Sequence, residues 1–187
     1  RDATSLSRAP GGRDPLSGDL LFQSRNIERA RIYGADLRFA QDLAAWSATL
    51  RGWSLDLSAY WAEGENRQSG APLNSIAPPQ AVAGITWTSV DASWDAGATL
   101  THTAAKSADD IDMSAEPRFA TPSWTTLDLA AGWRPLERLE LRAGVFNLAD
   151  ETYWRWLDVA NLAANDPMIP LLSRPGRSYS LSARIAF

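Results

Sequence analysis

Residues 176–187 have the sequence G-R-S-Y-S-L-S-A-R-I-A-F, in which apolar and polar residues alternate. Every second residue counted back from the last one is apolar or aromatic; the set is Tyr179, Leu181, Ala183, Ile185 and Phe187. A period of two predicts a β-strand with one apolar face and one polar face. Because such a strand would promote aggregation if it were exposed to water, we interpret it as the closing strand of a sheet whose apolar face meets lipid.

The same alternation recurs in six earlier segments. It is clearest over residues 51–63, and it returns at about 28–40, 81–87, 94–101, 127–134 and 139–146. The sequence therefore predicts an all-β protein of seven long antiparallel meander strands, each of about 10–13 residues. A tilted strand needs ~9–11 residues to cross a bilayer, whereas strands of globular proteins have nearer 5–6, so this length favours a transmembrane β-barrel.

The connections between these segments alternate in length. Short ones lie near 41–50, 89–93 and 135–138, and long polar ones lie near 64–75, 106–122 and 148–175. Outer-membrane barrels have short periplasmic turns and long extracellular loops, so we expect the last strand to start at the extracellular rim and to end at the periplasmic side. Residues 1–19 are rich in proline, glycine, serine and charge, which predicts a loop.

Four tryptophans lie on the apolar faces of these segments, close to the short connections: Trp53, Trp87, Trp94 and Trp133. Tryptophan favours the membrane interface, where its ring meets lipid and its N–H meets the headgroups. The four are therefore predicted to form a periplasmic aromatic girdle, with Trp61 at the outer rim. The alternative is that they fill the core of a soluble sandwich, but a core would scatter them along the strands.

The composition narrows the range of functions. The chain has 187 residues, a formal net charge of −4, no cysteine and one histidine. No stretch approaches the ~18 consecutive apolar residues of a membrane helix, which excludes a helical membrane protein. The lack of a basic excess argues against nucleic acid as a partner, and the lack of cysteine excludes disulfides and zinc–cysteine sites.

The only histidine, His102, falls on the apolar, lipid-facing side, because it shares its parity with Leu100. We therefore expect no nucleophile–histidine–acid set, no catalytic residues and no resident metal, and an enzymatic function is disfavoured. Charged residues on the polar faces are predicted to line the barrel lumen, where they could pair across strands: Asp36, Arg38, Asp56, Asp128, Arg134, Glu140, Arg142 and Arg184.

Seven strands do not close a bacterial barrel, which takes an even number from eight upward. Either residues 1–24 contain an eighth strand, which could begin at about 20–24, or the chain is the C-terminal part of a larger barrel. The loop-like composition of residues 1–19 favours the second interpretation.

The end of the chain resembles the C-terminus of TonB-dependent outer-membrane receptors. The resemblance is carried by G-V-F-N-L-A-D-E-T-Y-W-R-W-L-D-V (144–159) and by P-G-R-S-Y (175–179) at the start of the closing strand. Further similar pieces are R-I-Y-G-A-D-L (31–37), I-A-P-P (76–79) and F-A-T-P-S-W-T-T-L-D-L (119–129). The run Y-W-R-W-L-D-V, with P-M-I-P at 167–170, is most similar to the haem/haemoglobin receptor branch.

By that resemblance, residues 20–187 are the last third of a 22-stranded barrel in the bacterial outer membrane, and residues 1–19 are a remnant of an extracellular loop. The family implies import of haem or haem-protein iron with energy from the TonB complex, which contacts an N-terminal segment that is absent here, as is the plug. The alternatives are a ferric-siderophore receptor and, from another class, a small outer-membrane barrel acting as an anchor or adhesion protein.

Two further expectations concern partners. The pattern Tyr179, Leu181, Ala183, Ile185 and Phe187 resembles the signal that the barrel-assembly machinery recognises by strand addition. In the last extracellular loop, Tyr153, Trp154, Arg155 and Trp156 are candidate ligand-binding residues, because tyrosine can ligate haem iron, tryptophan can stack on a porphyrin and arginine can pair with a propionate. The alternative is that the loop aromatics pack against the barrel rim. No covalently bound cofactor is expected.

Overall fold

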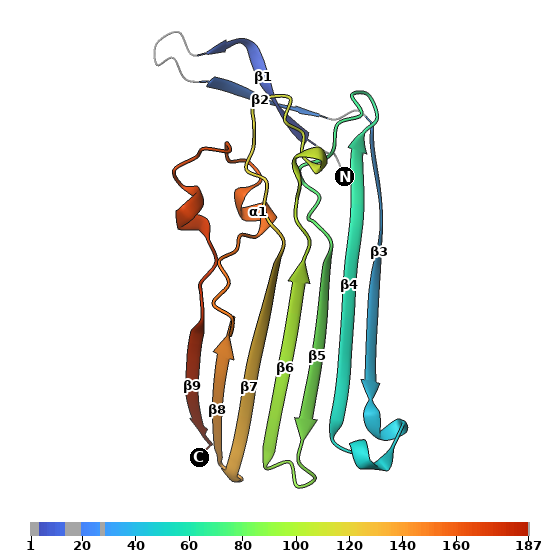
Figure 1. Ribbon diagram of the computed structural model, residues 1–187, viewed down its shortest axis with the longest axis vertical. Helices are drawn as coiled ribbons and strands as arrows, with labels where there is room; N and C mark the ends of the chain where they lie inside the picture. The colour runs from blue at the N-terminus through green and yellow to red at the C-terminus, as the bar shows by residue number, and fades with distance from the viewer. Residues whose placement is uncertain (1–3, 14–19, 27–28, 187) are drawn as a thin grey trace.

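The structure is a computed structural model that describes residues 4–13, 20–26 and 29–186, the first two ranges by their backbone alone. Seven strands form one antiparallel meander in chain order (Figure 1). They are β3 (Ala30–Asp42), β4 (Trp53–Asn66), β5 (Gln80–Thr88), β6 (Trp94–Thr103), β7 (Trp124–Leu136), β8 (Leu139–Phe146) and β9 (Ser178–Ile185). The predicted seven-stranded meander is confirmed.

Within the predicted loop over residues 1–19, the described residues 4–13 form a strand, so the prediction was wrong for that part. Strand β1 (Thr4–Arg13) pairs with β2 (Leu20–Asn26) in a separate two-stranded sheet. Proline and glycine at residues 10–12 suggested a loop, and the register of the pair is irregular between Arg8 and Arg13, which spans those residues. Pairing with β2 outweighs local composition there, since strand formation depends on cross-strand context. In the described ranges neither β1 nor β2 joins the seven-stranded sheet.

The register confirms the predicted division into faces. Directly paired residues of an antiparallel sheet share a face. Leu57 pairs with Ala83, Ala83 with Leu100 and Leu100 with Leu127, so the apolar sets of four neighbouring strands form one surface. The same parity continues through Val145 on β8 to Tyr179 on β9, where the two residues pair. Both faces of the sheet are open, which suits a barrel wall with lipid on one side and a lumen on the other.

The connections follow the expected alternation. The short ones occupy residues 43–52, 89–93 and 137–138, and the first of them contains the 3-10 helices η1 (Leu43–Ala45) and η2 (Ala48–Leu50). The long ones occupy 67–79, 104–123 and 147–177 and gather at the opposite end of the sheet (Figure 1). They carry η3 (Ala108–Asp110), α1 (Trp156–Val159) and η4 (Ile169–Leu172).

The hydrophobic core lies mainly among the long loops rather than on the sheet. Ile111, Trp156 and Ala160 form a buried cluster there, with Met113 and Ala120 packed against it. On the sheet, by contrast, large apolar side chains stay open, and Leu181 on β9 is 84% exposed. Within the described residues no helix is both long and apolar enough to cross a membrane.

Candidate functional site

The three long loops form one layer, which we call the loop layer (residues 67–79, 104–123 and 147–177). The second and third loops bond each other directly, by the bridge between Arg118 and Ala163, and Asn74 joins the first loop to both. The Asn74 side chain donates to the carbonyl of Asp112 at 3.1 Å and accepts from the Asp112 N–H at 2.7 Å. The backbone carbonyl oxygen of Asn74 accepts from the Trp156 indole N–H at 2.8 Å. The first long loop therefore bonds both others, although the contacts span up to 82 residues of sequence.

Trp156, one of the four candidate ligand residues, is a core residue of the loop layer. Its side chain is only 3% exposed and packs on Ile111 and Ala160. The ammonium of Lys106 lies 5.7 Å from the centre of its indole ring, within cation–π range. Trp156 thus has no open face on which a porphyrin could stack in this arrangement.

Tyr153 and Trp154 also pack within the loop layer. The Trp154 indole N–H donates to the Ile169 carbonyl at 2.7 Å. The Trp154 ring also meets the Phe119 ring edge-on, with the two ring centroids 5.5 Å apart. The centroid of the Tyr153 ring lies 4.1 Å from the centroid of the Trp124 ring at the start of β7. Packing, which was the alternative to ligand binding, therefore describes the contacts of these aromatics, and their ligand role stays a prediction.

Arg155 is the exposed member of the candidate set. It precedes α1 and its carbonyl accepts from the Asp158 N–H at 3.1 Å, which fixes its backbone. Among the described residues its guanidinium has no hydrogen-bond or ion-pair partner. A fixed backbone with a free guanidinium can pair with a carboxylate from outside the chain.

Two residues that the sequence analysis missed hold the base of the last loop. The Asn147 side chain donates to the Glu151 carbonyl at 2.8 Å and accepts from the Glu151 N–H at 2.9 Å, while its backbone N–H donates to Asp128 at 2.7 Å. The Asp150 carboxylate accepts from the N–H of Arg177, where the chain returns, at 2.6 Å. Asn147 and Asp150 have φ of 52° and 59°, a conformation that asparagine and aspartate tolerate well. The only sequence signal for a role of Asn147 and Asp150 was their place in the motif N-L-A-D (147–150).

The polar face carries a charge cluster near the short turns, formed by Asp95, Arg134, Glu140 and Arg142 on three strands. The distances from guanidinium nitrogen to carboxylate oxygen are 3.2 Å for Arg134 and Asp95 and 3.3 Å for Arg134 and Glu140. For Arg142 they are 2.8 Å to Glu140 and 3.6 Å to Asp95. Three of these residues were predicted to line the lumen and to pair; Asp95 was not singled out. Each arginine bridges two carboxylates, so the cluster is internally neutral and leaves no acid–base pair free for chemistry.

The four predicted girdle tryptophans share the apolar face at the short-turn end. Trp53 pairs directly with Trp87 in the register, and Trp94 pairs with Trp133. The rings of Trp94 and Trp133 stack with centroids 5.1 Å apart and planes 14° apart. This placement is what a girdle requires, and the membrane depth of the rings stays a prediction.

His102 lies on the apolar face, where one ring nitrogen hydrogen-bonds the Thr125 hydroxyl at 2.8 Å. Within the described residues no group of three or more histidine, aspartate or glutamate side chains is placed to hold a metal ion. The assembly-signal residues of β9 point the same way from an exposed strand: Tyr179, Leu181 and Ile185 are 72%, 84% and 60% exposed. Phe187, the last residue of that signal, lies outside the described residues.

Two ionisable groups outside the strands have shifted pKa values. In the turn between β5 and β6, the hydroxyls of Ser89 and then Ser93 donate to Asp91 and lower its pKa to about 2. In the loop layer, burial lowers the pKa of Lys106, and the nearby Asp110 carboxylate partly opposes that shift.

Comparisons with known proteins agree with this geometry. The family model described as "TonB dependent receptor-like, beta-barrel" matches residues 2–148. The chain is 24% identical, over 98% of its length, to the probable hemoglobin and hemoglobin-haptoglobin-binding protein 4 of Haemophilus influenzae, and it spans 20% of that protein.

Two solved structures show the same fold. The copper transporter OprC matches with a TM-score of 0.76 and 24% identity, over 100% of this chain and 27% of that chain. A variant of the ferric enterobactin receptor of Pseudomonas aeruginosa matches with a TM-score of 0.66 and 19% identity, again over 100% of this chain and 27% of that chain. The family match over most of the chain, together with the meander and its two faces, shows that this protein belongs to the TonB-dependent receptor β-barrels of the outer membrane.

Proposed function

We propose that the chain is part of an outer-membrane receptor that imports haem, or iron from a haem protein, with energy supplied through TonB. The observation that carries this proposal is the similarity to haemoglobin-binding relatives over almost the whole chain, at 98% and 89% coverage for two Haemophilus influenzae proteins. Because the chain spans only about 20% of the length of such relatives, the activity is proposed for the whole receptor.

In this function the described residues have two tasks. The strands form a stretch of barrel wall, with lipid on the apolar face and the charge cluster on the lumen side. The loop layer presents a preformed outer surface, from which Arg155 can pair with a propionate or with a carboxylate of a protein ligand. Tyr153, Trp154 and Trp156 shape that surface by packing beneath it. The ligand is transported cargo and is not bound covalently.

Two partners belong to the same proposal. The TonB complex contacts receptors of this family through an N-terminal segment outside these residues. The barrel-assembly machinery recognises the closing strand through the β9 edge and its alternate apolar side chains Tyr179, Leu181, Ala183 and Ile185, followed by Phe187.

A ferric-siderophore receptor is the second candidate, and the fold likeness to the ferric enterobactin receptor favours it. A small outer-membrane barrel serving as an anchor or adhesion protein has less support. Its eighth strand would have to come from residues 1–24, but the described parts of that range pair with each other. In lipid, the two unpaired edges of the seven-stranded sheet would be strongly unfavourable.

The test uses the full-length receptor as the only iron-uptake route of an iron-starved bacterium. Growth on haemoglobin or haemin that disappears when TonB is inactivated is expected, together with no growth on a panel of ferric siderophores. Growth on a siderophore alone would replace the proposal with the second candidate. Arg155→Ala should weaken haemoglobin binding, whereas Arg138→Ala, an exposed arginine at the opposite end of the sheet, should not.

A further inference from the structure

Strand β9 has one free edge. Among the described residues it pairs with β8 alone, so no strand lies opposite its other edge. The apolar side chains of β9 are also unusually open: Leu181 is 84% exposed, whereas Leu100 and Leu129 on inner strands are 46% and 37% exposed. Because a barrel in a bilayer leaves no strand edge unpaired, a further strand of the receptor must lie against this edge.

The direction of that further strand follows from the meander. β9 runs from the long loops toward the short turns, and neighbouring strands of this sheet are antiparallel (Figure 1). An antiparallel neighbour on the free edge therefore runs toward the long loops and leaves the sheet beside Ser178, the first residue of β9. We name the line between the two strands the seam, and the connection that follows the further strand the seam connection. None of the described residues supplies it.

The part of the loop layer nearest to the seam is η4, which ends six residues before β9 begins. In Figure 1 it is the orange-red coil above β9, on the side of the sheet away from β3. Its backbone is held from within the layer, since the Ile169 carbonyl accepts from the Trp154 indole N–H and the Met168 N–H donates to the Asp166 carboxylate at 2.8 Å. The Ile169 side chain is buried.

The outward side of η4 is apolar. Leu171 is 73% exposed and Met168 is 49% exposed, although the backbone that carries them is fixed. Within the described loop layer, all exposed large apolar side chains belong to the last loop: Leu148, Leu157, Met168 and Leu171. Apolar side chains that gather on one side of a molecule mark a contact surface, and this side is the one that adjoins the seam.

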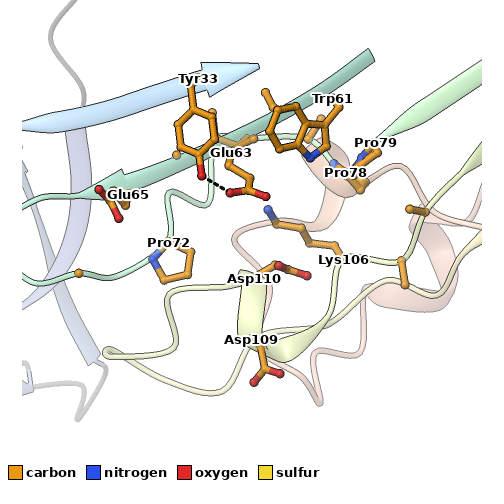
Figure 2. Close-up of a pocket in the computed structure, with 17 residues that line it drawn as sticks. Tyr33, Trp61, Glu63, Glu65, Pro72, Pro78, Pro79, Lys106, Asp109 and Asp110 are labelled. Atoms are coloured by element: carbon orange, nitrogen blue, oxygen red, sulfur yellow. Dashed lines mark hydrogen bonds between the residues drawn. The ribbon is translucent and has the colours of Figure 1, made fainter. Parts of the chain in front are cut away.

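The opposite corner of the loop layer has another character. There a pocket of about 410 Å³ opens where β3 and β4 meet the first two long loops (Figure 2). Its polar groups have partners within the chain: the Tyr33 hydroxyl donates to Glu63, and the Asp110 carboxylate lies near the Lys106 ammonium. The exposed apolar surface of η4 is therefore a local property of the β9 side and not a general property of the layer.

We propose that Met168 and Leu171 pack against the seam connection of the same receptor and so fasten the outer end of the seam. The occupant follows from continuity with the β9 edge, because the further strand brings its connection to the place where η4 stands. Burial of the two side chains on folding supplies the stabilisation. The proposal does not depend on the transported ligand, since it rests on the sheet edge and on η4.

The experiment places the photoreactive residue p-benzoylphenylalanine at position 171 of the full-length receptor in intact cells and identifies cross-linked peptides by mass spectrometry. The same residue at position 181 identifies the strand that pairs with β9. Position 171 should cross-link to the connection that follows this strand, with equal yield with and without haemoglobin. The control is position 90, where Val90 is an exposed apolar residue of a short turn at the opposite end of the sheet, and it should give no such product.

A cross-link from position 171 to haemoglobin or to another protein, in place of the receptor's own connection, would overturn the proposal. So would the absence of any cross-link to the receptor. These outcomes are separate from growth on haemoglobin, whose failure would refute the proposed ligand and leave the seam contact untouched.

A pair of variants tests the energetic side. Leu171→Asp puts a charge on an exposed position, so it should be neutral if the residue faces water in the receptor. If the residue packs at the seam, the temperature at which the folded barrel is lost in semi-native gel electrophoresis should fall by a few degrees. Val90→Asp is the matched control and should leave that temperature unchanged. Equal temperatures for Leu171→Asp and wild type would show that nothing covers η4.

Discussion

The carboxylate of Asp150 accepts a hydrogen bond from the backbone N–H of Arg177 at 2.6 Å, across 27 residues of chain. This bond joins the two ends of the last long loop where it leaves β8 and enters β9. Asn147, three residues before Asp150, reinforces the junction, because its side-chain amide also donates to the Pro175 carbonyl at 3.4 Å. The loop is therefore closed at its base by side chains rather than by further strand pairing.

Replacing Asn147 should loosen this base. Asn147→Ala removes the two side-chain hydrogen bonds to the backbone N–H and carbonyl of Glu151. Residue 147 is only 4% exposed, and the substitution also places alanine at a positive φ. We expect a loss of about 1–3 kcal/mol in the free energy of unfolding of the full-length receptor, measured by denaturant titration in detergent. Asn161→Ala, in the same loop at an exposed position without a described partner, is the matched control and should change little.

The charge cluster should contribute modestly and in a salt-dependent way. Arg134→Met removes the contacts to Asp95 and Glu140 and a hydrogen bond of 3.0 Å to the Ala92 carbonyl. Because these side chains are partly exposed, the expected loss of unfolding free energy is about 1 kcal/mol or less. The difference from wild type should shrink at high salt. A difference that is independent of salt would show that packing, not charge, is the contribution of Arg134.

The girdle assignment predicts membrane depth. A nitroxide attached at Trp133→Cys should report the interface by its accessibility to polar and apolar relaxation agents. The same label at Leu129→Cys, on the same face four residues along β7, should report a deeper, more apolar position. Equal depth at both sites, or water exposure at both, would contradict the assignment of the short turns to a membrane surface.

The Asp91 turn should depend on pH only in acid. The folded pKa of about 2 lies below the ordinary aspartate value of 3.8, so the hydrogen bonds from Ser89 and Ser93 favour the carboxylate. Their contribution is fully present above pH 3.8 and is lost as the pH falls toward 2. Wild type should therefore exceed Asp91→Asn in stability at pH 7, and acid titration of the two proteins should show that gap closing below pH 3.8. A gap that persists at pH 2 would contradict this origin.

The strands could be predicted because each one carries its own period of two, and lipid on one side preserves that pattern without interruption. Leu100 and Trp133 could be assigned to a face from parity alone. The loop layer could not be predicted in this way, because its contacts depend on tertiary distance: nothing near Asn74 in the sequence indicates Trp156. Strand β1 was missed for another reason: proline and glycine at residues 10–12 suggested a loop, but pairing with the neighbouring β2 outweighs that local composition.

The same limit applies to the candidate site, where residue types could be read from the sequence but contacts could not. Chemistry-bearing residue types drew attention to Tyr153 and Trp156, but burial decides what an aromatic ring can contact, and burial is set by other loops. Asn147 and Asp150 were quoted within the family motif, yet their role follows from a return of the chain at Arg177 that the motif alone does not specify.

Asn74 has a mechanical consequence. Because its side chain and its carbonyl hold two different loops, no one loop of this layer can swing outward without breaking hydrogen bonds to the others. The three long loops therefore move together as one rigid unit rather than independently. A bulky ligand must then fit a shape that exists before it arrives, and its affinity is not reduced by the entropy of ordering loose loops.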